Sequence, residues 1–201
     1  MSDTTIKKPV NIRYITVTAM LSAVAFILMF LDFSVPFMPG FIKMDISELP
    51  ALIGAFSMGP ACGVIVCLVK NLLHLLITTT GGVGELSNFS LGAVFVLTAG
   101  LIYKKKKSRK RALAGSLAGA ALMAVISVFS NYFLVYPFYS MIMPVDVIVS
   151  MYQAILPSVN GLLECLIVFN MPFTFLKGMF SVVITFLIYK HISPILKGAE
   201  R

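Results

Sequence analysis

The sequence predicts an all-α membrane protein with six transmembrane helices and both termini in the cytoplasm, on the basis of composition and charge distribution. The chain of 201 residues is 59% hydrophobic and only 12% charged, with a mean hydropathy of +0.97. A soluble domain has about 25% charged residues. Most of the 16 lysines and arginines lie in three clusters, at residues 7–13, 104–111 and 190–201. Basic loops stay on the cytoplasmic side of a bilayer, so these clusters orient the chain.

Each expected span is an apolar segment bounded by charged residues or by turn-forming proline and glycine. The second span is short and begins with Glu48 and Pro50. This suits a helix start, because the carboxylate lies at the positive end of the helix dipole and proline has no N–H to leave unpaired there. Gly59 and Pro60 form a tight turn to the third span. The six spans are expected at residues 14–31, 46–58, 61–77, 88–103, 112–136 and 172–191, in a single domain of residues 1–201.

The second half of the chain is less regular. A loop rich in threonine and glycine separates the third span from the fourth, and basic residues 104–111 separate the fourth from the fifth. Residues 137–170 contain apolar pieces interrupted by proline, asparagine and glycine, and they fit no single element. The sixth span is expected to begin at Pro172, which suits an opening helical turn. Six crossings return the C-terminus to the side of the N-terminus, as the basic clusters require.

A polar stripe on the sixth span is the strongest indication of a binding site. Asn170, Thr174, Lys177 and Ser181 are separated by four, three and four residues, so they share one face of a helix that is otherwise mostly apolar. A lysine and an amide in such a helix must point into the bundle or into a wet cavity. We therefore expect Asn170, Thr174 and Lys177 to bind a ligand. The alternative for Lys177 is a packing role beside a neighbouring carboxylate.

Further candidates lie toward the outer face, where the connections are long, apolar and rich in glycine and proline. Asn131 on the fifth span is expected near the level of Thr174 and Lys177, and it serves either a ligand or an interhelical hydrogen bond. Aromatic and apolar loop residues suit a lid over a flat ligand, although they suit anchors in lipid equally well. The loop candidates are Phe41, Met44, Glu85 and Asn88.

Lys70 is expected in the middle of the third span, where a cation needs a carboxylate partner. We expect a structural role for this lysine and for the neighbouring Asn71. The candidate partners of Lys70 are the carboxylates of Asp45, Glu48 and Glu85. We expect the same structural role for Asp45 and Glu48.

No pattern in the sequence indicates catalysis or a bound cofactor. There is no Walker motif, the three cysteines lack the spacing of metal ligands, and His74 has no second histidine or cysteine at such a spacing. We therefore expect no enzymatic activity, no metal and no cofactor. The basic residues 104–111 indicate a turn facing anionic lipid, not nucleic acid. The alternatives are an intramembrane hydrolase that uses Glu48 or Glu85 with His74, and a stand-alone carrier.

Three segments of the chain resemble one family of transport proteins. They are DISELPALIGAFSMGP at residues 45–60, VKNLLH at 69–74 and GVGELSNF at 82–89. These segments are similar to the riboflavin-specific substrate-binding subunit, or S component, of energy-coupling factor (ECF) vitamin transporters, and the resemblance extends over essentially the whole chain. It implies six helices in a bacterial cell membrane and a riboflavin site beneath the outer loop between the first two spans. It also implies assembly with a membrane scaffold (T) subunit and two cytoplasmic ATPases.

The resemblance also assigns roles to single residues. Asn131 and Lys177 match polar positions of the family's ligand site, whereas Thr174 stands where relatives can carry an amide. Small residues on the first span make the scaffold contact in this family. Here they match Ala19 and Ala23, whose spacing permits close helix contact. The same architecture serving another vitamin, such as thiamin or biotin, is the alternative.

Overall fold

The computed structural model describes residues 12–39, 42–78, 80–141 and 143–197. The regular secondary structure of this part of the chain is helical except for a short antiparallel hairpin, in which β1 (Phe33–Ser34) pairs with β2 (Lys43–Met44). The expected class, an all-α membrane protein, is confirmed. Of the described helices, α2 (Glu48–Ser57) is a short apolar helix, and five are long and apolar enough to cross a membrane: Ile12–Met29, Pro60–Ile77, Val83–Lys105, Arg109–Tyr139 and Leu162–Tyr189.

Several of these long helices combine more than one element. In the first half of the chain the elements are α1 (Ile12–Met29), α3 (Pro60–His74), a 3₁₀ turn η1 (Leu75–Ile77) that extends α3, and α4 (Val83–Lys105). In the second half they are α5 (Arg109–Ser130), the π-helical segment η2 (Asn131–Val135), α6 (Tyr136–Tyr139), α7 (Val145–Gln153), α8 (Leu162–Cys165), the π-helical segment η3 (Leu166–Asn170) and α9 (Met171–Lys197).

Each π-helical segment is followed within two residues by a proline. Pro137 and Pro172 have no N–H, and in a regular helix a proline ring clashes with the carbonyl group four residues earlier. The wider turns of η2 and η3 contain those carbonyl groups, so the helix continues past each proline instead of breaking. The structure therefore corrects the expected start of the sixth span. The helix begins at Leu162 and not at Pro172, and it includes the end of the ambiguous stretch.

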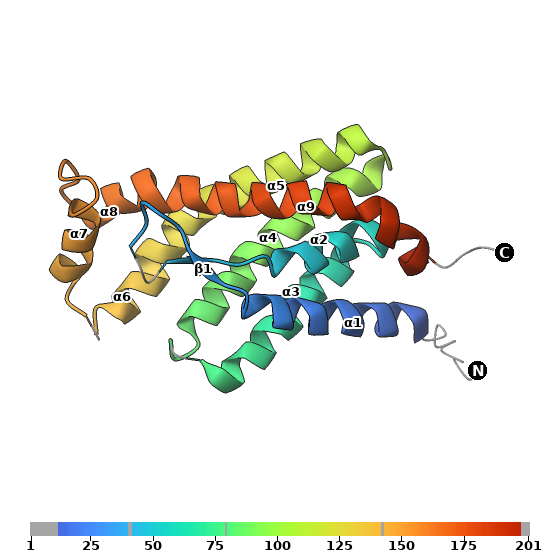
Figure 1. Cartoon of the computed structure of the whole chain (residues 1–201), viewed down its shortest axis with the longest axis horizontal. Coiled ribbons are helices and arrows are strands. Elements are labelled where there is room, and N and C mark those ends of the chain that lie inside the picture. Colours follow the sequence, from blue (N-terminus) through green and yellow to red (C-terminus); the bar gives the residue numbers. More distant parts are fainter. Residues whose placement is uncertain (1–11, 40–41, 79, 142, 198–201) are drawn as a thin grey trace, which may run out of the picture.

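The short helix α2 lies in the middle of the bundle (Figure 1). It packs against α1, α3, α4 and α9, and its residues from Glu48 to Phe56 are all buried. A helix that is apolar on all sides suits such an interior position. The start of α1, the α4–α5 turn and the C-terminal end of α9 lie at one end of the molecule (Figure 1). The expected topology requires this arrangement, and six crossings with cytoplasmic termini stay a prediction.

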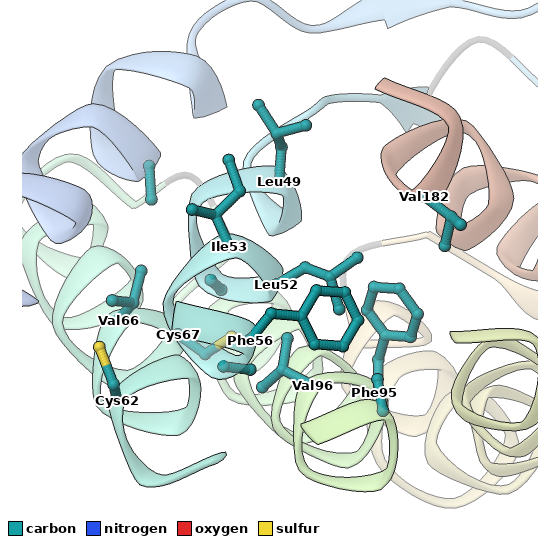
Figure 2. Packing of buried hydrophobic residues seen from close by; sticks show 14 of the residues in the cluster. Leu49, Leu52, Ile53, Phe56, Cys62, Val66, Cys67, Phe95, Val96 and Val182 are labelled. Carbon is teal, nitrogen blue, oxygen red and sulfur yellow. The ribbon is translucent and has the colours of Figure 1, made fainter. Parts of the chain in front are cut away.

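Around α2, buried side chains from α1, α3, α4, α5 and α9 form the main apolar cluster, part of which is shown in Figure 2. Leu52 and Phe56 of α2 pack against Phe95 and Val96 of α4, with Val182 of α9 beside them. Lipid tails are as apolar as these side chains, so in a bilayer the contacts stabilise the fold through close packing more than through removal from water. This packing fixes α2, and with it the polar residues at its N-terminal end.

The close approach of α4 and α5 depends on Gly119. A β-carbon at this position would lie 2.6 Å from the backbone carbonyl oxygen of Phe95, so the two helices would have to move apart. We expect Gly119→Val to destabilise the protein by about 1–3 kcal/mol, the usual effect of overpacking an interior. Thermal unfolding in detergent measures this. Gly161→Val is the control, because a β-carbon there would meet no described atom within 4 Å. Equal melting temperatures for the two variants would contradict the prediction.

Candidate ligand-binding site

A cavity of about 250 Å³ lies next to strand β2, between α2, α4, α5 with η2, and α9 with η3. Its walls combine apolar side chains with several polar ones. The apolar side chains are Ile42, Leu91, Met123, Val135 and Phe173, and the polar ones are Lys43, Glu48, Ser87, Asn88, Asn131, Tyr136, Tyr139, Asn170, Thr174 and Lys177. The cavity therefore suits a small molecule with apolar surfaces and several hydrogen-bonding groups.

Most of the residues that the sequence singles out for ligand binding line this cavity: Asn88, Asn131, Asn170, Thr174 and Lys177. Ser181, the last member of the polar stripe, is fully buried and does not line it. Met44 is buried and also does not line it, whereas Phe41 lies outside the described residues. The structure thus brings three of the four members of the polar stripe to one cavity, and their role in ligand binding stays a prediction.

Two of the amides in the cavity wall are placed by the π-helical segments. Asn131 is the first residue of η2, and Asn170 is the last residue of η3. π-Helical turns are rare in proteins overall, but many of those that occur lie at functional sites. The extra residue in such a turn changes the direction of the side chains. Here each such turn brings an asparagine to the same cavity from a different helix.

Lys177 is paired with a carboxylate and lines the cavity at the same time. Its ammonium group donates a hydrogen bond to Oδ2 of Asp45 at 2.7 Å and lies 3.7 Å from Oε2 of Glu48. Oδ1 of Asp45 accepts a hydrogen bond from the backbone N–H of Ser47 at 2.8 Å. Burial alone would raise the pKa of Asp45, but Lys177 and Lys70 together hold it below its ordinary value. Asp45 therefore stays ionised and holds the lysine in place.

Lys70 completes a buried ion cluster, formed by Asp45, Glu48, Lys70 and Lys177. Lys70 is fully buried and donates to the hydroxyl oxygen of Ser47 and to Oε1 of Glu48, the latter at 3.0 Å. Of the three carboxylates that the sequence offers as partners of Lys70, the structure selects Glu48. Oε2 of Glu48 accepts no hydrogen bond from the described residues. The cluster contains two positive and two negative groups, so its charges balance.

Glu85 and Asn71 act within the protein and not at the cavity. Oε1 of Glu85 is 2.8 Å from Nδ1 of His74, and Oε2 accepts a hydrogen bond from the hydroxyl of Thr80 at 2.8 Å. Both carboxylate oxygens of Glu85 thus brace the α3–α4 connection, which differs from the expected role in ligand binding. Nδ2 of Asn71 donates to the carbonyl oxygen of Cys67, one turn earlier in the same helix.

Residues 13–189 of the chain match the sequence model of the family described as "ECF transporter, substrate-specific component". The chain belongs to this family of S components.

Several proteins with curated names are similar to this S component over nearly its whole length. The "Riboflavin transporter RibU" of Staphylococcus aureus (strain TCH60) is 37% identical over 93% of this chain and 93% of its own length. The "Riboflavin transporter FmnP" of Bacillus subtilis (strain 168) is 30% identical over 92% of this chain and 94% of its own. The structure reported as "Structure and mechanism of the S component of a bacterial ECF transporter" has a TM-score of 0.72 at 34% identity, and the match covers 92% of this chain and 98% of that chain.

The small residues Ala19 and Ala23 of this S component lie on the exposed side of α1. The helix buries its other side, which includes Thr18, Leu21 and Ala25. The strip formed by Ala19 and Ala23 is therefore accessible from outside the bundle, as a docking surface for another helix requires.

Several cavity residues of this S component are not predicted from the sequence. Tyr136 follows Asn131 by five residues, and a regular α-helix places residues five apart on different faces. The π-helical turn between them brings both to the cavity, and nothing in the local sequence other than the following Pro137 indicates it.

Among the described residues, no group of three or more histidine, cysteine, aspartate or glutamate side chains is placed to hold a metal ion.

Proposed function

We propose that this S component captures riboflavin at the outer face of a bacterial plasma membrane and delivers it across with partner subunits. The observation that supports the proposal is the cavity, whose lining combines three asparagines and two lysines with apolar side chains. Riboflavin has a flat, largely apolar ring with polar edges and a hydroxyl-rich tail. Buried polar atoms without partners are costly, so the ring edges and the hydroxyls require the amides and the lysine.

In this proposal six helices cross the membrane, and α2 is the short second span. Both termini and the basic α4–α5 turn lie in the cytoplasm, and the β1–β2 hairpin and the cavity face outward. The S component assembles with a membrane scaffold (T) subunit and two cytoplasmic ATPases, which supply the energy by hydrolysing ATP. Riboflavin is the cargo, and the S component itself carries out no covalent chemistry.

Titration of the purified protein with riboflavin tests the ligand. Bound flavin is expected to lose fluorescence, with saturation at one equivalent, whereas thiamin and biotin should not bind. Saturable binding of thiamin or biotin in place of riboflavin would show an S component for another vitamin. Vesicles that contain only this chain should show no riboflavin uptake, and ATP-independent uptake by the lone chain would show a stand-alone carrier.

The exposed strip on α1 leads to a prediction about assembly. Ala19→Trp should leave riboflavin binding intact and abolish uptake by the assembled complex, because an indole separates helices that small residues allow to approach. Val24→Trp is the matched control, since Val24 is also exposed on α1 but lies on a different side of the helix. Normal uptake by the Ala19→Trp complex would show that this strip is not the docking surface.

A further inference from the structure

A chain of hydrogen bonds links two cavity residues through a third residue that the cavity does not reach. The hydroxyl groups of Tyr136 and Tyr152 are 2.7 Å apart, and the hydroxyl of Tyr152 donates to Oδ1 of Asn170 at 2.7 Å. Tyr136 and Asn170 line the cavity, whereas Tyr152 is fully buried in α7 and its ring packs against Phe169. The three linked residues come from α6, α7 and η3, which the sequence alone does not bring together.

The direction of each hydrogen bond in this chain follows from its chemistry. An amide oxygen can only accept, so Tyr152 uses its single hydroxyl proton on Asn170. The bond between the two tyrosines must then use the proton of Tyr136. Burial raises the pKa of Tyr152, so its proton is retained at any physiological pH. The orientation of the Asn170 amide is therefore fixed by a group outside the cavity.

The amide of Asn170 has one oxygen and one NH₂ group, and Tyr152 holds the oxygen. The side chain of Asn170 also interacts with the hydroxyl of Tyr136, which can accept at most one of the two NH₂ hydrogens, so the other is available to a ligand. Because Asn170 lines the cavity and its oxygen is turned to the buried Tyr152, the group that it offers to a ligand is the NH₂ donor. Without Tyr152 the amide could rotate by half a turn and present its oxygen instead, since the two ends have nearly the same shape.

We propose that Tyr152 is a positioning residue, which holds the Asn170 amide with its NH₂ group toward the cavity so that this position recognises a hydrogen-bond acceptor of the ligand. The proposal rests on the proposed function for the identity of the ligand. In riboflavin the acceptor is a carbonyl oxygen or an unprotonated nitrogen of the ring system. A ligand that presented an amide or ring N–H group at this point would be excluded, because two donors would face each other.

A double-mutant cycle tests the proposal, with riboflavin affinity measured by fluorescence titration of Tyr152→Phe, Asn170→Ala and the double variant. Each single variant should bind roughly fivefold more weakly, the effect of one neutral hydrogen bond. The double variant should bind no more weakly than Asn170→Ala, because Tyr152 acts only through the amide. Tyr132→Phe is the control, since Tyr132 is partly exposed and does not line the cavity. If Tyr152→Phe weakens binding by the same factor in both backgrounds, Tyr152 acts through packing and the proposal is overturned.

A spectroscopic measurement covers the case in which Tyr152→Phe does not fold. In the vibrational spectrum of riboflavin bound to the wild-type protein, the accepting group should show the frequency of a hydrogen-bonded group, and Asn170→Ala should shift that band toward the frequency of a group without a donor. An unchanged spectrum would overturn the assignment of Asn170 as a donor. A wild-type protein that binds no riboflavin would overturn the proposed function itself, and the two failures are thus distinguishable.

Discussion

Lys177→Ala should weaken riboflavin binding at least tenfold, which corresponds to about 1.4 kcal/mol. Lys177 lines the cavity and uses part of its donor capacity on Asp45. Its removal takes away a charged donor and leaves Asp45 without the cation that it accepts a hydrogen bond from, whereas Glu48 keeps its closer partner Lys70. The unpaired carboxylate of Asp45 would repel the acceptor groups of a flavin. Fluorescence titration of the purified variant measures the effect, and unchanged affinity would contradict the assignment of Lys177 to the ligand site.

A second variant separates loss of a ligand contact from damage to the ion cluster. Lys177→Met combined with Asp45→Asn removes one positive and one negative charge, so the pair of Lys70 and Glu48 stays balanced. We expect this double variant to be about as stable as the wild type and to bind riboflavin as weakly as Lys177→Ala. Wild-type affinity in the double variant would show that Lys177 serves only to neutralise Asp45.

The same pair predicts how acid affects the protein. The pKa of Asp45 in the folded state lies below its ordinary value of 3.8, because Lys177 and Lys70 outweigh the effect of burial. A carboxylate with a lowered pKa stabilises the fold above its unfolded pKa, and this contribution is lost as the pH falls through the folded value. The stability difference between the wild type and Asp45→Asn should therefore be constant around neutral pH and disappear only in strong acid.

Patterns that act along a single helix could be predicted from the sequence. Hydropathy and the basic clusters indicate the membrane class, because a bilayer requires apolar spans and basic loops stay on its cytoplasmic side, and both features can be read along the chain. The stripe of Asn170, Thr174 and Lys177 indicates the cavity because helical periodicity holds from η3 into α9, and all three residues line it. The start of the last helix at Leu162 could not be predicted, because a proline such as Pro172 usually opens a helix, and the π-helical turn that accommodates it has no clear sequence pattern.

Choices between chemically equal residues could not be predicted either. Asp45, Glu48 and Glu85 are all carboxylates near the third helix, and the sequence does not rank them as partners of Lys70. The structure decides because α2 is enclosed by four other helices, which places Glu48 against Lys70 and leaves Glu85 at the α3–α4 connection. Tyr152 shows the same limit, since its contact with Asn170 joins two elements across the stretch that fits no single pattern.

Lys70→Met should destabilise the protein by about 3–5 kcal/mol, the usual effect of removing one partner of a buried ion pair. Lys70 and Glu48 are both buried, and without the lysine Glu48 has only the more distant contact with Lys177. The hydroxyl of Ser47 loses a charged donor as well. Thermal unfolding of ligand-free protein in detergent measures the change. Ligand-free protein is necessary because Glu48 also lines the cavity. With riboflavin present, the melting temperature would reflect both the lost ion pair and any change in riboflavin binding.

Lys70→Met combined with Glu48→Gln is the decisive companion variant, because it removes the charge that the single variant leaves unpaired. Replacing both members of a buried pair by neutral groups is often close to neutral in stability, whereas removing one member is not. We therefore expect the double variant to melt near the wild type and well above Lys70→Met alone. If Lys70→Met by itself melts like the wild type, Glu48 is not an ionised partner of Lys70. The ion cluster would then reduce to Asp45 and Lys177, and the position of α2 would depend on apolar packing alone.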